Sequence, residues 1–231
     1  RNIMVDPEIE QQAGTLKYPP KDKYNLVAIS FFFFGLGGWI TWNAAITGID
    51  YFDSRFKPEY NPKFFFGFIF TWPLFFGNFL LLYLADKVSL GIKVNISFVV
   101  IIICTASMPI ITEYLEKTAA WYILLLTIFL NGLANSFVQG GLFGFCSIFP
   151  QKYMVIMMTS QALAGVILSS VKIMCLIILP PDNENKEDIN IYYNSVIYIS
   201  VGTLILLGCV FFYNFCYSLE YVQFYIKNSQ C

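Results

Sequence analysis

Six long apolar stretches, separated by short polar segments, dominate the chain. A helix that spans a bilayer needs about 20 mostly apolar residues. Six stretches reach or nearly reach this length: 25–49, 64–85, 94–111, 119–149, 153–179 and 192–217. The third is marginal, and the fourth is long enough to tilt or to extend beyond the bilayer. The pattern predicts an all-α polytopic membrane bundle of six transmembrane helices over 25–217, preceded by a polar amino-terminal segment over 1–24.

Composition supports a membrane protein and excludes several classes of chemistry. Hydrophobic residues make up 57% of the chain and charged residues only 13%, whereas soluble domains are about 25% charged. The formal net charge of −1 gives no indication of a nucleic-acid partner. The sequence contains no histidine, which excludes Ser-His-Asp catalysis, HExxH metal sites and histidine proton relays. The six cysteines form no CxxC pair, so we expect no metal, no cofactor and no enzyme activity.

An even number of spans places both ends of the chain on one side of the membrane. If that side is inside, the inner segments carry Lys17, Lys21, Lys23, Lys87, Lys93, Lys152 and Lys227. The outer loops then carry fewer basic residues, namely Arg55, Lys57, Lys63, Lys117 and Lys186. The positive-inside rule therefore favours cytoplasmic termini. Acidic residues are crowded into the last outer loop, over 182–188, which we expect to be solvated.

The fourth stretch carries a line of amide side chains at membrane depth. Asn131, Asn135 and Gln139 are spaced i, i+4, i+8, so on a helix they share one face. Gly140 and Gly144 follow at the spacing that lets two helix backbones approach closely. Buried amides are costly unless they face protein, water or a ligand. The stripe therefore predicts one wall of a binding site.

The link between the fourth and fifth stretches is very short, at 150–152, and predicts a tight antiparallel hairpin. This hairpin would place the amide stripe beside the fifth span, where Gln161, Gly165, Ser169 and Lys172 fall on one face. Lys172 lies near the apparent outer end of its span. We expect it to extend to the membrane surface or to pair with an outer carboxylate, rather than to act in transport.

The first and second spans contain polar and helix-bending positions. Trp42 and Asn43 offer a flat aromatic face beside an amide, or alternatively a packed helix crossing in which Asn43 bonds to a neighbour. Pro73 predicts a kink in the second span, either structural or at a point where a transporter bends. No Asp or Glu lies in the middle of any stretch, which fits a neutral solute that moves down its gradient.

Three motifs carry a resemblance to a known family. GLGGWITWN in the first span, LANSFVQGGLFGFCSIFP in the fourth and TSQALAGVILSSV in the fifth resemble the equilibrative nucleoside transporter family. The resemblance implies half of a major-facilitator-like eleven-helix transporter, in which six plus five helices enclose a cavity and rock in alternating access. This chain is then the amino-terminal six-helix half, and 218–231 begins the intracellular central loop. The carboxy-terminal helical half, with its ribose-binding Asp/Arg pair, is not present in this chain.

The family's site residues carry over to particular positions of this sequence. The resemblance implies that Gln139 hydrogen-bonds the nucleobase, since an amide offers both a donor and an acceptor. It implies that Trp42 packs on the flat ligand. Four further positions fall where the family's cavity is lined, namely Trp39, Ile46, Thr71 and Leu74. Asn135 stands where an inhibitor-sensitive relative has glycine, so we expect weak sensitivity to bulky thiopurine-riboside inhibitors.

The resemblance implies facilitative transport of nucleosides or nucleobases across the plasma membrane by alternating access. The expected partners are the solute, the lipid bilayer and the missing helical half. Two alternatives remain open. One is a major-facilitator-type carrier of another small neutral solute, and the other is a membrane scaffold without transport. A scaffold is favoured if the polar seam is closed and dry, with Gln139 bonded only to other helices.

Overall fold

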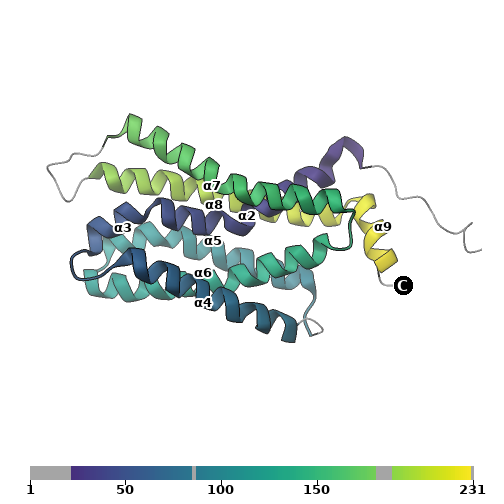
Figure 1. Ribbon diagram of the computed structural model, residues 1–231, viewed down its shortest axis with the longest axis horizontal. Helices are drawn as coiled ribbons and strands as arrows, with labels where there is room; N and C mark the ends of the chain where they lie inside the picture. Colours follow the sequence, from purple (N-terminus) through teal and green to yellow (C-terminus); the bar gives the residue numbers. More distant parts are fainter. Residues whose placement is uncertain (1–21, 85–86, 181–188, 230–231) are drawn as a thin grey trace, which may run out of the picture.

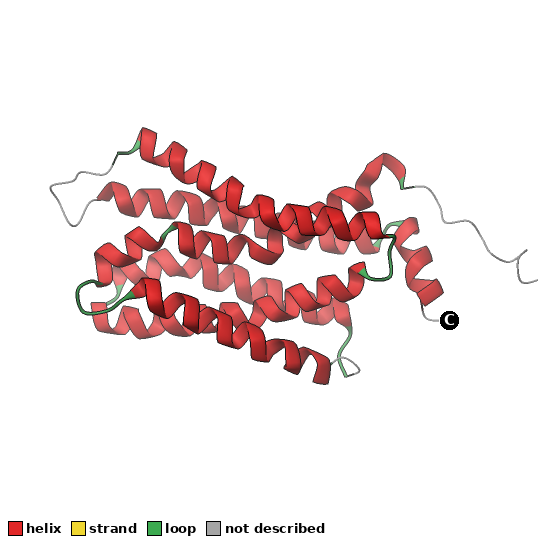
Figure 2. Cartoon of the chain, viewed as in Figure 1, coloured by secondary structure: helices red, strands yellow, loops and turns green. Residues whose placement is uncertain are grey.

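The computed structural model describes residues 22–84, 87–180 and 189–229, and every regular element within these ranges is a helix (Figure 2). The elements are η1 Lys23–Asn25, α2 Leu26–Thr47, α3 Ile49–Phe56, α4 Pro62–Tyr83, α5 Leu90–Tyr114, α6 Lys117–Cys146, α7 Gln151–Ile178, α8 Ile189–Tyr217 and α9 Glu220–Ser229. The predicted all-α class is confirmed. Most of the predicted polar segment 1–24 and the acidic loop 182–188 lie outside the described residues.

Six of these helices are long and apolar enough to cross a membrane: η1 with α2, then α4, α5, α6, α7 and α8. They match the six predicted spans, and their ends agree within four residues. The largest difference is at α5, which begins at Leu90 rather than at 94. Polar side chains in its first turns have partners, because Lys93 Nζ donates to the Leu84 carbonyl at 3.0 Å and Asn95 Nδ2 to that of Gly91 at 3.0 Å. The marginal third stretch therefore forms a full span, and the chain is a multi-pass membrane protein.

Two short helices were not predicted. In α3 the charged residues Asp50, Asp53 and Arg55 interrupt the apolar run, yet Phe52 and Phe56 are completely buried. In α9 Val222 is completely buried and Tyr221 nearly so, although the segment as a whole is polar. Both helices are amphipathic and cap the bundle at opposite ends, as Figure 1 shows.

The long helices form two groups that lie side by side (Figure 1). In the first group α2 packs on both α7 and α8, and in the second α6 packs on both α4 and α5. The contact of α5 with α8 joins the two groups, and α2 touches α6 more sparingly. The beginning of α2 and the whole of α9 lie at the same end of the bundle, as an even number of spans requires. We call this end the terminal end and the other the α3 end.

Aromatic side chains hold the terminal end together. Phe31 of α2 is completely buried, and its ring centroid lies 5.9 Å from that of Phe145, 5.2 Å from that of Phe149 and 5.3 Å from that of Tyr153. These residues come from α6, the link and α7, so the α2 ring lies where α6 and α7 meet. A second apolar cluster, which includes Phe52, Phe56, Phe66 and Trp121, packs α3, α4 and α6 at the α3 end.

The predicted hairpin between the fourth and fifth spans is wrong beyond its short link. After the turn, α7 packs along α2 and α6 along α4 and α5, so contact between α6 and α7 is slight. The small residues explain this choice of partners. A side chain at Gly140 would overlap Leu81 of α4, one at Gly35 of α2 would overlap the Met157 carbonyl of α7, and Gly144 faces open space. Glycine therefore permits close α6–α4 and α2–α7 packing, not an α6–α7 seam.

Candidate functional site

Gln139 is the member of the amide stripe that reaches another helix. Its Nε2 donates a hydrogen bond of 2.9 Å to the Gly38 carbonyl of α2. A Cβ added at Gly38 would lie 3.6 Å from Gln139 Cγ and 3.4 Å from Nε2 of Gln161 on α7. Amides from α6 and α7 thus flank the same glycine of α2. Gln139 is half-buried, and within the described chain its Oε1 accepts no hydrogen bond. The arrangement leaves one acceptor of Gln139 for a partner.

Trp42 lies one helical turn beyond Gly38, which is about 6 Å along the axis of α2. Its ring stacks on that of Phe70 in α4, with centroids 4.6 Å apart and an interplanar angle of 22°. The side chain is half-buried. Phe70 therefore covers one face of the Trp42 ring, which the sequence predicted to pack on a ligand. Neighbouring Asn43 donates to the Trp39 carbonyl of its own helix at 2.9 Å, so the expected bond to a neighbouring helix is not made.

Asn131 and Asn135 are sealed inside the bundle. Each is 1% exposed, and neither side-chain oxygen nor nitrogen has a hydrogen-bond partner among the described residues. Leaving a buried polar group unpaired costs about 1–3 kcal/mol. Three hydroxyls share this condition, those of Thr41 on α2, Thr105 on α5 and Tyr213 on α8. The stripe is thus divided, since Gln139 remains accessible and the two asparagines do not line an open cavity in this conformation.

The other predicted lining residues lie in the second half of α2 and in the middle of α4. Trp39 packs against the larger apolar cluster and Leu74 against the smaller one, and both are half-buried. Ile46 is 48% exposed, and Thr71 is also exposed. The structure therefore brings Gln139, Gly38 and Gln161 together and places Trp42 against Phe70. The two groups lie about one turn of α2 apart.

Lys172 makes the predicted pair with a carboxylate. Its Nζ lies 2.8 Å from Asp50 Oδ2 and donates to the Thr47 carbonyl at 2.7 Å. Thr47 is the last residue of α2, where carbonyl groups are left without intrahelical donors. The ammonium therefore ties α7 to the end of α2 and to α3. This contact lies at the α3 end, far from Gln139.

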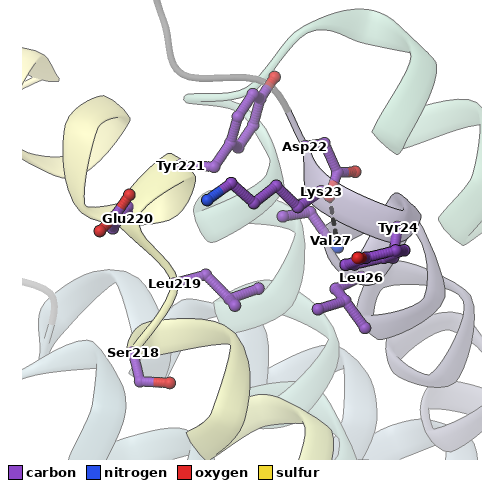
Figure 3. Close-up of a pocket in the computed structure, with 9 residues that line it drawn as sticks. All are labelled: Asp22, Lys23, Tyr24, Leu26, Val27, Ser218, Leu219, Glu220 and Tyr221. Carbon is purple, nitrogen blue, oxygen red and sulfur yellow. Dashed lines mark hydrogen bonds between the residues drawn. The ribbon is translucent and has the colours of Figure 1, made fainter.

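A cavity of about 330 Å³ lies at the terminal end, between the start of α2 and the start of α9 (Figure 3). Asp22 lines it and accepts a hydrogen bond of 3.1 Å from the Val27 backbone and one of 3.2 Å from the Tyr153 hydroxyl. None of the site residues expected from the sequence lines this cavity. Among the residues that the structure describes, no cluster of three or more His, Cys, Asp or Glu side chains could hold a metal ion.

Two contacts near the candidate site were not predicted from the sequence. Gln161 was recognised as part of a polar face, but its neighbour was expected to be α6 rather than Gly38 of α2. Phe70 lies in a continuous apolar run, and no spacing distinguishes it from the phenylalanines around it. Only the spatial position of α4 shows that Phe70 is the residue against which Trp42 stacks.

Comparison with known proteins shows that the chain is similar to transporters. Residues 124–230 match the family model described as "Nucleoside transporter". The chain is 25% identical over 222 residues to equilibrative nucleotide transporter 1 of Arabidopsis thaliana, covering 94% of this chain and 48% of that protein. It is 27% identical over 168 residues to equilibrative nucleoside transporter 2 of Homo sapiens, covering 64% of this chain and 36% of that protein. The chain thus spans about half the length of the first of these relatives and about a third of the second. The family model and the relatives together confirm that this chain resembles the equilibrative nucleoside transporter family, as its motifs in the first, fourth and fifth spans predicted.

Proposed function

We propose that the complete protein mediates facilitative transport of nucleosides, and that Gln139 recognises the base. The half-buried amide of Gln139 at the junction of α2, α6 and α7 is the observation that carries this proposal. Its bond to the Gly38 carbonyl fixes one end of the amide, while Oε1 remains an acceptor for a base amino or imino group. A side chain that is accessible yet held by another helix is suited to recognition because its orientation is already determined.

Trp42 and Phe70 form the apolar part of the proposed site. Their stacked rings lie about one helical turn from the level of Gly38. An aromatic pair of this kind presents edges and one outer face against which a flat base can pack. We propose that Trp39, Ile46, Thr71 and Leu74 supply further lining of the site, and that Asn135, closed off in this conformation, joins them when the helices rearrange during transport.

The charges of the chain favour a neutral solute over a phosphorylated one. Phosphate recognition uses Lys or Arg side chains or helix N-termini. Lys172 lies at the α3 end and is already paired with Asp50. Lys93 lies in the first turn of α5. No Lys or Arg lies within α2 or α6, the helices that meet at Gln139 and Gly38, beyond the first residue of α6. We therefore include nucleosides and nucleobases in the proposed substrate range, and not nucleotides.

Transport by alternating access needs a second wall opposite these helices. The relatives are about twice as long as this chain, which supports a complementary set of helices in the complete protein. Of the six long helices, α4 and α7 bury the smallest shares of their apolar windows, 22% and 17%. Both leave surface that lipid or further helices can cover. We propose that the protein resides in the plasma membrane, with both ends of this six-helix chain on the cytoplasmic side.

A membrane scaffold is the second candidate, because Asn131 and Asn135 are closed off inside the bundle. Gln139 is also bonded to another helix, which is the condition expected for a scaffold. However, Gln139 is half-buried and retains an unused acceptor, unlike the two asparagines. A scaffold would give no solute uptake above background.

The proposal is tested by uptake of radiolabelled uridine and adenine into cells that express the complete protein with Gln139→Ala. Loss of a hydrogen bond worth about 1.5 kcal/mol or more lowers uptake at subsaturating solute roughly tenfold. Gln151→Ala is the matched control, because Gln151 is an exposed glutamine at the start of α7. Background uptake by the unaltered protein overturns the transport proposal. Equal uptake by both variants overturns the role of Gln139 alone.

A further inference from the structure

A second cavity, of about 140 Å³, lies at the α3 end of the bundle. It is enclosed by the end of α2, the start of α3, the last turns of α7 and the first turns of α8. Its lining residues include Thr47, Asp50, Lys172, Asn194, Ser195 and Tyr198. Thr47 is nine residues beyond Gly38 on α2, which separates this cavity from Gln139 by about 13 Å along the helix axis. It is therefore distinct from the proposed base site.

The cavity contains a buried acceptor without a partner. Asn194 is 5% exposed, and its Nδ2 donates to the Leu179 carbonyl at 3.1 Å. Its Oδ1 is buried and accepts no hydrogen bond from any described residue. A buried amide oxygen in this state has lost its solvation without a replacement. An occupant that donates a hydrogen bond to Asn194 Oδ1 would replace the lost solvation.

Hydroxyl groups beside Asn194 continue the polar wall. Tyr198 is 2% exposed and donates to Ser195 Oγ at 3.1 Å, while Ser195 Oγ donates to the Ile191 carbonyl at 2.9 Å. The Tyr198 oxygen can therefore still accept. A side chain at Gly48 would overlap this phenol, so glycine at that position is what leaves room for Tyr198 in the wall.

An ion pair also lines the cavity. Lys172 Nζ uses two of its three hydrogens on Thr47 and Asp50, and the third remains available. The side chain of Asp50 is 66% exposed, and only its Oδ2 takes part in this pair. The paired charges disfavour an ionic occupant. The ammonium repels a cation, whereas the carboxylate and the Asn194 and Tyr198 oxygens repel an anion.

We propose that this cavity binds the vicinal hydroxyls of a ribose, as a docking subsite for nucleosides at the α3 end. A hydroxyl both donates and accepts, so it can donate to Asn194 Oδ1 and accept from Lys172 Nζ. A neighbouring hydroxyl can donate to the Tyr198 oxygen, whose own hydrogen is used on Ser195. Leu176 and Ile191 supply an apolar surface for the sugar carbons. The volume is below the roughly 300 Å³ of pockets that enclose a whole ligand, so only part of a nucleoside fits.

This inference rests on the proposed transport of nucleosides, but its test measures binding. Leu176 lines the cavity and is 38% exposed, whereas the adjacent Ile177 is 75% exposed and lies outside the cavity lining. Leu176→Cys and Ile177→Cys are made separately in the complete protein with Cys231→Ser. The cysteines that the structure describes are all buried. Labelling by a charged methanethiosulfonate reagent is followed in permeabilised membranes, so that either membrane side is reached.

We expect uridine to slow labelling of Leu176→Cys at least threefold and to leave Ile177→Cys unchanged. An equal concentration of 2′,3′-dideoxyuridine, which lacks both hydroxyls, should give no protection. Adding Tyr198→Phe, which removes one hydroxyl and little volume, should abolish the protection by uridine. Equal protection by the two nucleosides, no protection, or protection that survives Tyr198→Phe overturns the subsite. Uptake is measured in parallel. Normal uptake without protection overturns the subsite alone, whereas background uptake overturns the transport proposal.

Discussion

Gln139 Nε2 on α6 donates to the carbonyl oxygen of Gly38 on α2 at 2.9 Å, across the junction of the two helix groups. Because α2 packs mainly on α7 and α8, and α6 on α4 and α5, few other contacts join these two helices directly. The absence of a side chain at Gly38 brings the amides of Gln139 and Gln161 close to the same turn of α2. The candidate site is therefore located where the two groups meet.

Gly38→Ala should be tolerated. The added Cβ would lie 3.4 Å from Gln161 Nε2 and 3.6 Å from Gln139 Cγ, which is ordinary van der Waals contact with flexible side chains. Alanine is a better helix former than glycine by up to about 1 kcal/mol, so we expect an unchanged or slightly higher unfolding temperature in detergent. Uptake of uridine should decrease, because the methyl group occupies space between the two amides.

Gly132→Ala is the matched glycine variant, and here we expect the opposite effect on stability. A Cβ at Gly132 would overlap the backbone carbonyl of Phe70, which cannot move without displacing α4. Overpacking of this kind costs about 1–3 kcal/mol. A lower unfolding temperature for Gly132→Ala than for Gly38→Ala supports the two packing arrangements, and equal temperatures contradict them.

The sequence predicted the spans well because length and hydropathy are properties of a single helix. It predicted the neighbours of those helices poorly, since a glycine or amide on one face does not show which helix lies opposite. Gln139 and the two asparagines were placed on one face of α6, but their spacing does not show that Gln139 is half-buried and the asparagines are closed off. Helix α3 was not predicted because Asp53 and Arg55 alternate with Phe52 and Phe56, so the segment is not apolar enough to stand out in the sequence.

Replacing Asn131 with leucine should stabilise the protein or leave its stability unchanged. The amide is 1% exposed and unpaired within the described residues, so its removal relieves a desolvation cost of about 1–3 kcal/mol. Leucine has the same branching pattern, although it is larger and part of this gain is offset by crowding. Thermal unfolding in detergent measures the change. A clear loss of stability would show that the amide has a partner in the complete protein.

Asn95→Leu, in contrast to Asn131→Leu, should lower the stability of the protein. Asn95 Nδ2 donates to Asn214 Oδ1 at 3.3 Å, and Asn214 Nδ2 donates back to Asn95 Oδ1 at 2.9 Å, so the amides link α5 to α8. Interhelical polar pairs in membranes contribute about 0.6 kcal/mol on average and up to about 1.7 kcal/mol. We expect a destabilisation in this range. The double variant Asn95→Leu with Asn214→Leu should be less destabilised than the sum of the two single variants, and additivity would exclude the pair.

The ion pairs of Asp53 predict that the stability of the fold at the α3 end depends on pH. Burial raises the pKa of this carboxyl, but hydrogen bonds and charge from Lys57 and Lys63 outweigh it, so the pKa lies below its ordinary value of 3.8. Both Nζ atoms lie 2.9 Å from Asp53 Oδ2. A carboxyl with a lower pKa in the folded state stabilises the protein above the unfolded-state pKa. This contribution disappears as the pH falls below 3.8 and through the folded-state pKa.

Asp53→Asn should therefore lower stability at pH 7 and lower it less at about pH 3. The two lysines are half exposed, and solvent screening limits the expected loss at pH 7 to about 1 kcal/mol. Glu59→Gln is the matched control, since Glu59 is 59% exposed and pairs with Lys117 at 3.4 Å. Unfolding temperatures at both pH values provide the measurement. The difference in unfolding temperature between Asp53→Asn and the unaltered protein is compared at the two pH values. If it is the same at pH 7 and pH 3, the carboxylate charge does not hold α3 to the start of α4.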